Sequence, residues 1–263
     1  MSYFQCHFQS KALLTSVTVT ITLPFPFFDP LSPEIAFDEI YRIEKRFKTL
    51  YLFHGAFADA NSWFWFTRVM DYANRYGFAI VAPNVGNSFY ADLKHGPAYW
   101  TFVSEELPRY VRAVFPLSEK REDNFAAGLS MGGYGALKLA LNKPEHYAAA
   151  VSLSGVLDIV TVMKNPIHPI FNPDEYFGGL DSLEGSHNDL FAQLRKLKQE
   201  GKSIPRLYIA CGWDDNLYEM NKRFRDFALS NDVALTYEEG PGGHTWDFWD
   251  HYIHRALEWL ASL

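Results

Sequence analysis

One stretch decides the fold of this 263-residue chain: FAAGLSMGGYG, at positions 125–135. Its first five residues are apolar or small without a break, which is typical of a short strand buried on both faces. A segment of helical character follows at 133–141. Between the two, Gly128-x-Ser130-x-Gly132 places a small residue two positions before and after a serine, so that the backbone can turn sharply. The stretch therefore predicts a strand, a tight turn with Ser130 at its tip, and a helix.

Strands and helices alternate on both sides of this stretch. Further strands are predicted at 49–53, 78–82, 147–153, 206–210 and 235–239. Further helices are predicted at 63–76, 99–115, 188–199, 217–229 and 246–260. Two alternating segments near the start, 3–8 and 16–23, read as antiparallel strands. The pattern predicts an α/β fold with a mostly parallel central sheet, antiparallel N-terminal strands and helices on both faces.

The regular alternation is interrupted in two places. Residues 24–33 hold four prolines and are predicted to be a loop. Residues 158–187 hold three prolines and two adjacent glycines, Gly178 and Gly179, and are predicted to be an irregular insertion. No linker or internal repeat divides the sequence. We therefore predict a single domain over residues 1–263, with the segment 158–187 as a partial lid.

Composition narrows the range of partners. The formal net charge is −7, which argues against nucleic acid, and no polybasic cluster points to a membrane surface. The N-terminus lacks the pattern of a signal peptide, and no apolar run reaches roughly 18 residues, so a cytoplasmic location is predicted. No metal site is predicted, because HExxH and tight His/Cys/Asp clusters are absent from the sequence, and no cofactor is predicted. Cys6 and Cys211 are predicted to be reduced, buried thiols.

The pattern around Ser130 matches the nucleophile elbow of the α/β-hydrolases. The alternative is a glycine-rich turn in which Ser130 only caps a helix. In that fold an acid and then a histidine follow the serine along the chain. His244, on the short glycine-rich loop Gly240–His244, is the predicted base. The acid is predicted on the loop after the strand 206–210, where the residues themselves leave Asp214 and Asp215 as alternatives.

Acyl transfer also needs two N–H donors for the oxyanion. One is the amide of the residue after the nucleophile, Met131. The other is predicted to be the amide of Ala56, in the loop that follows the strand 49–53, because Gly55 lets the chain turn that amide inward. His54, in the same loop, is expected to order it through hydrogen bonds rather than to act as the base.

Aromatic residues crowd the loops near this predicted site. Phe57 and Trp63 follow one strand end, and further aromatic side chains lie in the segment 158–187. Because ligands bind at the carboxyl ends of parallel strands, we predict that Phe57 and Trp63 line an acyl or aryl pocket. The alternative for each such residue is a place in the core.

Several segments together resemble a known family. They are GLSMGGYGALKLAL (128–141), LFHGAFADANSW (52–63), EELPRYV (105–111), CGWDDNLYEMN (211–221) and GGHTWDFWD (242–250). In this order they are similar to the tributyrin-esterase branch of the esterase D group, which includes S-formylglutathione hydrolases and the antigen 85 mycolyltransferases. The resemblance covers nearly the whole chain; the segment 158–187 is the part that departs from it.

The resemblance implies Ser130 as nucleophile and His244 as base, and it selects Asp215 over Asp214. It agrees with Ala56 as an oxyanion donor. It implies a serine carboxylesterase for short acyl, aryl or acetylated-sugar esters, often oligomeric. An S-formylglutathione-type thioesterase is the alternative activity, and a non-catalytic binding protein with a hydrolase fold is the alternative of another class.

Overall fold

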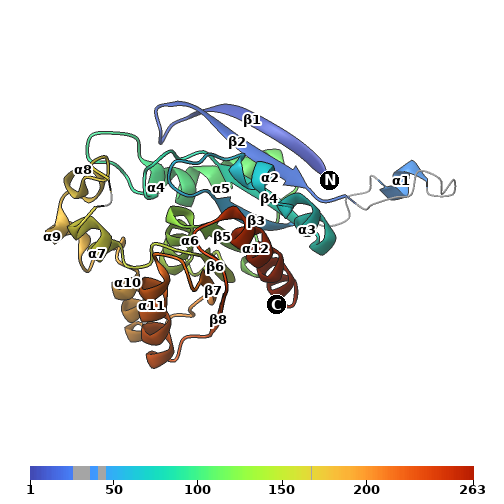
Figure 1. Cartoon of the computed structure of the whole chain (residues 1–263). Helices are drawn as coiled ribbons and strands as arrows, with labels where there is room; N and C mark the ends of the chain where they lie inside the picture. The colour runs from blue at the N-terminus through green and yellow to red at the C-terminus, as the bar shows by residue number, and fades with distance from the viewer. Residues whose placement is uncertain (26–35, 41–45, 167) are drawn as a thin grey trace.

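A twisted sheet forms the frame of the molecule. The computed structural model describes residues 1–25, 36–40, 46–166 and 168–263, and these form an eight-stranded sheet in the order β1-β2-β4-β3-β5-β6-β7-β8 (Figure 1). The strands are β1 Ser2–Ser10, β2 Thr15–Leu23, β3 Lys48–Phe53, β4 Phe78–Pro83, β5 Asn124–Leu129, β6 Ala149–Leu153, β7 Arg206–Gly212 and β8 Leu235–Gly240. The β1–β2 and β2–β4 pairs are antiparallel and all other neighbours are parallel. The predicted mixed sheet is confirmed.

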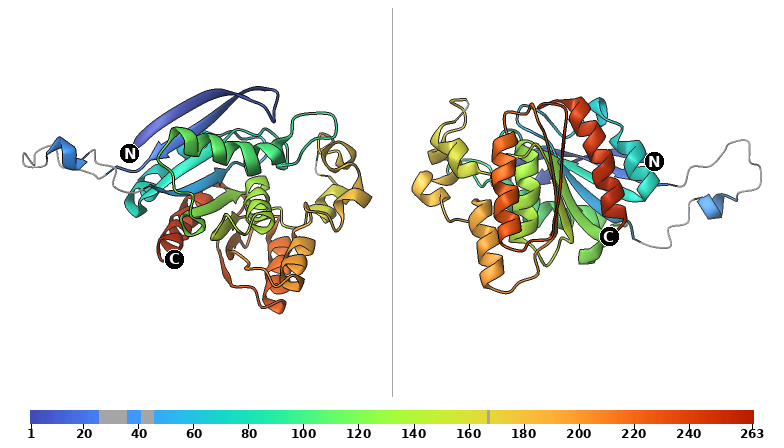
Figure 2. Two further views of the ribbon diagram at one scale, coloured as in Figure 1. Left: turned by 180° about the vertical axis from the view of Figure 1, so that it is seen from behind. Right: turned by 60° about the horizontal axis from the view of Figure 1, so that its bottom comes forward.

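Helices cover both faces of this sheet. Their bounds are α1 Phe37–Ile40, α2 Ser62–Phe66, α3 Val69–Tyr76, α4 Tyr99–Thr101, α5 Leu107–Val114, α6 Met131–Asn142, α7 Ile159–Lys164, α8 Pro173–Phe177, α9 Leu180–Leu183, α10 Leu190–Gln199, α11 Tyr218–Ser230 and α12 Trp246–Ala261. A π-helix, η1, covers Phe102–Glu106, and a 3₁₀ turn, η2, covers Arg121–Asp123. Helices α3 and α12 lie side by side on one face, as Figure 2 shows. Helices α5, α6 and α11 pack on the other face.

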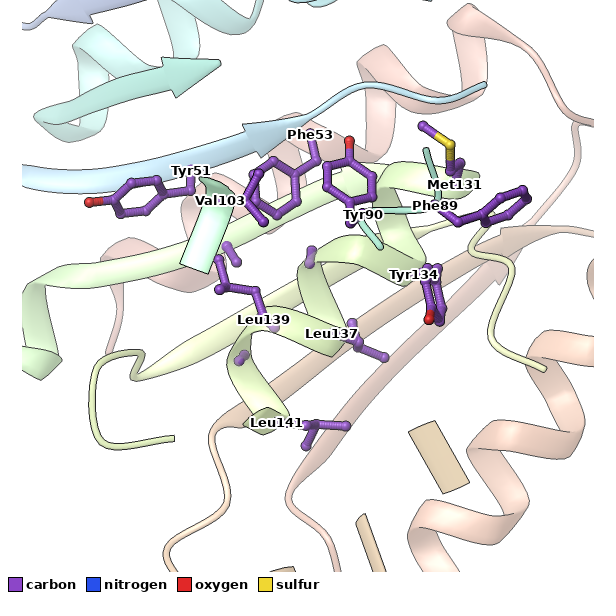
Figure 3. Close-up of a cluster of buried hydrophobic side chains, with 14 of the residues drawn as sticks. Tyr51, Phe53, Phe89, Tyr90, Val103, Met131, Tyr134, Leu137, Leu139 and Leu141 are labelled. Atoms are coloured by element: carbon purple, nitrogen blue, oxygen red, sulfur yellow. The ribbon is translucent and has the colours of Figure 1, made fainter. Parts of the chain in front are cut away.

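The central strands β3 to β7 are mostly apolar and buried along nearly their whole length, because each face of the sheet carries a core. In β3, Leu50 and Leu52 point into the core under α3 and α12, whereas Tyr51 and Phe53 point into the core under α6. Figure 3 shows the second of these cores, with Phe53 beside Tyr90 and the leucines of α6 below them. The helix α6 is buried from Met131 through Leu141, so the turn that precedes it is held rigidly.

Two predicted helices are interrupted in the structure. The helix predicted at 63–76 is two helices, since Thr67 is extended (φ −138°, ψ 169°) and its hydroxyl donates to the Trp63 carbonyl, 2.5 Å away. The helix predicted at 99–115 contains the π-helix η1, in which the Leu107 amide donates to the Phe102 carbonyl. The residue after Leu107 is Pro108, which has no N–H to give to the carbonyl four positions back.

The segment 158–187 contains three short helices, α7, α8 and α9, which lie together beyond one end of the sheet (Figure 1). The proline-rich loop predicted at 24–33 lies outside the described residues from position 26 onward. Cys211 is a buried free thiol as predicted, but Cys6 is only half-buried because β1 is the edge strand. In the described part of the chain, no helix has both the length and the apolar character needed to span a bilayer.

Candidate active site

Ser130 lies at the turn between β5 and α6, in a strained backbone conformation. Its φ is 53° and its ψ is −119°, a region that costs a non-glycine residue free energy. The flanking glycines make the turn possible: a Cβ at Gly128 would lie 2.3 Å from the Gly132 carbonyl oxygen, and one at Gly132 would lie 2.3 Å from the Phe53 carbonyl oxygen. The Ser130 amide donates to the Leu153 carbonyl at 2.9 Å, which fixes the turn to β6. The predicted strand–turn–helix geometry is present.

His244 and Asp215 come together from two loops at the same edge of the sheet. The His244 Nδ1 atom lies 3.0 Å from Asp215 Oδ2 and 3.2 Å from Oδ1. The Asp215 side chain is fully buried, whereas that of His244 is 33 % exposed. Asp214, the other candidate, is exposed. The geometry therefore pairs His244 with Asp215, the carboxylate that the family resemblance selects.

Burial and hydrogen bonding act on the Asp215 carboxyl in opposite directions. Burial by itself raises the pKa of this group, but hydrogen bonds from His244, the Leu217 amide and the Ser154 hydroxyl outweigh it, so that the pKa is lowered. The Leu217 amide donates to Asp215 Oδ1 at 2.8 Å. The Ser154 Oγ atom also accepts a hydrogen bond from the Trp249 indole at 3.1 Å. The carboxylate is thus held charged, in a fixed orientation, behind the imidazole.

Ser130 and His244 open into the same small cavity. Its volume is about 220 Å³. It is lined by Gly55, Ala56, Phe57, Ala58, Ser62, Phe66, Leu129, Ser130, His244, Trp246 and Trp249. A larger cavity of about 520 Å³ lies near Asp92, Trp100 and His187, but neither Ser130 nor His244 lines it. We therefore place the candidate chemistry in the smaller cavity.

The two predicted oxyanion donors lie beside Ser130. Ala56 lines the cavity, and Met131 is the first residue of α6, where amides have no partner within the helix. Within the described parts of the chain, neither the Ala56 nor the Met131 N–H has a hydrogen-bond acceptor. Both donors are therefore available to a ligand oxygen.

His54 orders the loop of residues 54–57, the predicted oxyanion loop, as expected from the sequence. Its Nε2 atom accepts a hydrogen bond from the Val85 amide at 3.1 Å, so Nδ1 carries the ring proton and donates to the Gly55 carbonyl at 2.8 Å. That carbonyl and the Ala56 N–H belong to one trans peptide and point in opposite directions. Burial lowers the pKa of His54, which keeps the ring neutral. Because the His54 ring holds the Gly55 carbonyl on its own side, the Ala56 N–H points away from that ring.

Comparison with known proteins agrees with this geometry. The family model named Esterase, described as "Putative esterase", matches residues 34–260. An acetyl esterase of Caldicellulosiruptor saccharolyticus is 37 % identical over 270 residues, which cover 100 % of this chain and 99 % of the relative.

The chain belongs to this esterase family.

Solved structures place the esterase among the serine hydrolases of the α/β-hydrolase fold. The fluorophosphonate-binding serine hydrolase F (FphF) of Staphylococcus aureus, with substrate bound, is 35 % identical, with a TM-score of 0.87 over 99 % of this chain and 98 % of the other. The S-formylglutathione hydrolase (FrmB) of the same organism is 35 % identical, with a TM-score of 0.85 over the same shares. The resemblance to the esterase D, S-formylglutathione hydrolase and antigen 85 family is confirmed, and the protein is a carboxylic ester hydrolase.

The two predicted substrate contacts occupy different places in the esterase. Phe57 lines the cavity and is 66 % exposed. Trp63 is fully buried, its indole nitrogen donates to the Phe53 carbonyl at 3.0 Å, and its ring packs edge-on against that of Trp246, at 5.7 Å. The prediction that Trp63 contacts substrate is corrected, because Trp63 is a core residue behind the cavity-lining Trp246.

Two residues near the site are not among the predicted site residues. Lys138 is fully buried in α6 and donates to the Tyr90 carbonyl at 2.6 Å. Tyr90 is also buried, and its hydroxyl donates to the His54 carbonyl at 2.8 Å. A signal for Lys138 exists in the sequence: it stands between Leu137 and Leu139 in a helix that is apolar all round. Tyr90 belongs to the aromatic residues that follow the predicted strand 78–82, a pattern that indicates a pocket and not a contact with His54.

The buried amine of Lys138 predicts a pH-dependent stability. Burial lowers its pKa to about 7, against the opposing effect of Asp92. Between pH 7 and 10 the unfolded chain keeps this amine protonated while the folded chain does not, so the free energy of unfolding should rise with pH. In Lys138→Met, we expect this rise to be smaller by about 1–3 kcal/mol between pH 7 and 9. Urea unfolding of both proteins at pH 6, 7, 8 and 9 tests this, and a constant difference would contradict it.

Proposed function

We propose that the esterase hydrolyses small, neutral carboxylic esters through an acyl-enzyme on Ser130. The observation that carries this is the single small cavity shared by Ser130, Ala56 and a His244 imidazole that is paired with the buried Asp215. In the proposed reaction, the Ser130 hydroxyl attacks the ester carbonyl as His244 Nε2 takes its proton. The negative charge that develops on the carbonyl oxygen is stabilised by the Ala56 and Met131 amides.

The same residues act in the release of the alcohol and in the hydrolysis of the acyl-enzyme. His244 returns its proton to the departing alcohol, and a water molecule then enters the position of the alcohol. His244 removes a proton from that water as its oxygen attacks the acyl carbonyl. His244 then gives this proton to the Ser130 oxygen as the bond to the acyl group breaks, which releases the acid and regenerates Ser130. Asp215 stays ionised throughout and holds the imidazole in the tautomer that presents Nε2 as the base.

Cavity size and lining favour a short, uncharged acyl group. The volume of about 220 Å³ is below the roughly 300–1,000 Å³ of pockets that hold drug-sized ligands. Among the described residues that line it there is no Asp, Glu, Lys or Arg. A charged acyl or leaving group would therefore have to find its partners outside this cavity. We place acetyl esters, the class named for the acetyl esterase relative, and the slightly larger butyryl esters ahead of the thioester S-formylglutathione.

The thioester is the second candidate because FrmB, which is 35 % identical and covers 99 % of this chain, is an S-formylglutathione hydrolase. The two activities are separated by measuring kcat/KM of the purified chain for p-nitrophenyl acetate, butyrate and octanoate and for S-formylglutathione. We expect the acetate and butyrate to be turned over fastest. Turnover of S-formylglutathione alone would replace the ester proposal, and absence of turnover of all four by folded protein would contradict both.

The segment 158–187 is proposed to close one side of the cavity. Phe57 lies at the cavity, and its ring contacts two members of that segment, Phe171 at 5.8 Å and His168 at 6.2 Å between ring centroids. Phe171 is fully buried and also packs against Phe89, at 5.0 Å. The aromatic contacts therefore link the segment to the edge of the cavity. This supports its proposed role as a partial lid.

Truncation of Phe57 tests the lid. In Phe57→Ala we expect the ratio of kcat/KM for octanoate to that for acetate to rise by at least about threefold, because loss of the ring opens the cavity toward longer chains. Trp65→Ala is the matched control, since Trp65 is a comparably exposed aromatic residue that does not line the cavity. An unchanged ratio in Phe57→Ala, or an equal change in both variants, would argue against the lid.

The cytoplasmic location, the single-domain organisation and homo-oligomerisation stay predictions from the sequence. Among the described residues, no group of three or more His, Cys, Asp or Glu side chains is arranged to hold a metal ion. The proposed reaction uses only groups of the protein and water.

A further inference from the structure

Three successive peptide groups of the oxyanion loop are held by side chains. The Tyr90 hydroxyl donates to the His54 carbonyl at 2.8 Å. The His54 ring holds the Gly55 carbonyl, also at 2.8 Å. The Asn87 side chain accepts a hydrogen bond from the Phe57 amide at 2.7 Å. The Ala56 N–H lies between these restraints, so its direction depends on all of them.

Tyr90 is the restraint that is tied to the nucleophile's own helix. A Cβ at position 135 of α6 would lie 2.4 Å from the Tyr90 ring, so Gly135 leaves the space in which that ring sits. One turn further along α6, Lys138 donates to the Tyr90 carbonyl at 2.6 Å. The Tyr90 ring packs beside that of Phe53, with centroids 4.7 Å apart, as Figure 3 shows. The residue is thus fixed at its ring and at its backbone.

The backbone around Tyr90 is strained in a way that needs such support. Phe89 and Tyr90 have φ values of 47° and 50°, and two consecutive non-glycine residues in this left-handed region are costly. The Tyr90 amide donates to the Ser88 hydroxyl oxygen at 3.1 Å. Lys138 is itself fully buried, with its amine nitrogen 4.8 Å from the centre of the Trp100 ring. Burying the amine of a lysine costs free energy, and a methionine of similar length would fit here without that cost. The hydrogen bond to the Tyr90 carbonyl is therefore the feature that a lysine adds at this position.

From these contacts we propose that Tyr90 and Lys138 are positioning residues that set the second oxyanion donor, the Ala56 N–H, relative to Ser130. The helix α6 carries Ser130 and the Met131 donor at its start, and it places the Ala56 donor through Lys138, Tyr90 and His54. The positions of both donors relative to Ser130 are therefore set by the same rigid helix, α6. This inference rests on the proposed function of Ser130 and Ala56.

The test is a comparison of tyrosine variants on p-nitrophenyl acetate. Tyr90→Phe removes only the hydroxyl that holds the His54 carbonyl. Because oxyanion donors act in the transition state, we expect kcat to fall about tenfold while KM stays within about twofold. Tyr134→Phe is the matched control: it removes a hydroxyl that is equally buried, on α6 itself, and that donates to the Asn188 carbonyl at 2.9 Å. We expect its kcat to match that of the wild type.

A second variant guards against simple loss of folding. Lys138→Met keeps the length of the side chain and removes the donor to Tyr90, and we expect a similar fall in kcat at unchanged KM. Because both residues act through the same loop, the double variant Tyr90→Phe/Lys138→Met should lose no more than about twofold beyond either single variant. If the two substitutions caused independent packing defects, their losses in kcat would instead multiply. Circular dichroism and the thermal midpoint of each variant, measured alongside, show that the assayed protein is folded.

The outcomes separate this inference from the proposed function. If Ser130→Ala is inactive but Tyr90→Phe keeps the wild-type kcat, the positioning role is overturned and the proposed function stands. A rise of KM at constant kcat, or equal losses in Tyr90→Phe and Tyr134→Phe, overturns the positioning role as well. If Ser130→Ala keeps wild-type turnover, the proposed function fails, and the inference fails with it.

Discussion

Replacing Ser130 with alanine is expected to lower kcat for p-nitrophenyl acetate by about 10⁴–10⁶-fold. The substitution removes the only atom that can form the acyl-enzyme bond in the proposed reaction, whereas the Ala56 and Met131 amides remain in place. The activity that is left is that of the oxyanion donors and of binding. The folded state should tolerate the change, because the φ of 53° at this position is strained for serine and alanine alike.

The covalent step can be observed directly with a fluorophosphonate probe, which forms a stable adduct with an activated serine. We expect labelling of the wild type at Ser130 and none of Ser130→Ala. Ser152→Ala is the matched control, because Ser152 is buried in β6 and its Oγ atom has no hydrogen-bond partner in the described part of the chain. Labelling of Ser130→Ala, or turnover within tenfold of wild type, would show that another group is the nucleophile.

Much of the framework around Ser130 follows from local sequence. The central strands are apolar on both faces because two cores meet them, and unbroken apolar runs are the signal of such strands. The elbow can be read from Gly128 and Gly132, since any side chain at either position would collide with backbone. Chain order then places an acid and a histidine at the same edge of the sheet. Asp215 and His244 are found within hydrogen-bond distance there, although residues alone did not separate Asp215 from Asp214.

What the sequence could not predict depends on contacts between distant segments. Trp63 reads as a pocket residue because it follows a strand end, but the helix α2 turns it into the core, where Phe53 and Trp246 meet it. Tyr90 stands among the aromatic residues of a loop, and its contact with the His54 carbonyl appears only when the loop after β4 crosses α6. The break at Thr67 likewise depends on a distant partner, because the adjacent Arg68 amide donates to the Asp250 carboxylate at 2.7 Å.

The site also shows why the acid is buried while the base is partly exposed. Asp215 accepts hydrogen bonds from His244 and the Leu217 amide, with the Ser154 hydroxyl as a third partner. Each of these three partners donates to the carboxylate, so the ionised form is favoured and its pKa falls despite burial. As the pH is lowered, this group keeps its charge below the range in which a free Asp is protonated. His244, 33 % exposed at its side chain, lines the same cavity as Ser130 and is open to solvent water.

Asp215→Asn should therefore lower kcat by about 10⁴-fold, whereas Asp214→Asn should leave it within about twofold of the wild type. An asparagine at 215 presents an NH₂ group to a site where all neighbours are donors. If its oxygen faces the Leu217 amide, its NH₂ faces His244 and stabilises the tautomer in which Nε2 carries the proton. That tautomer cannot take the proton of Ser130. Asp214 is exposed and, in the described chain, its carboxylate has no hydrogen-bond partner, so its amide form should change little.

Steady-state kinetics on p-nitrophenyl acetate over pH 6–9, with both variants folded by circular dichroism, measures the difference. The loss in Asp215→Asn should lie in kcat, because the defect is in proton transfer and not in ester binding. Fluorophosphonate labelling of this variant should slow in parallel, since it needs the same base. A larger loss in Asp214→Asn than in Asp215→Asn would assign the acid to the exposed loop position. It would also imply that His244 turns out of its pairing with Asp215 when an ester is bound.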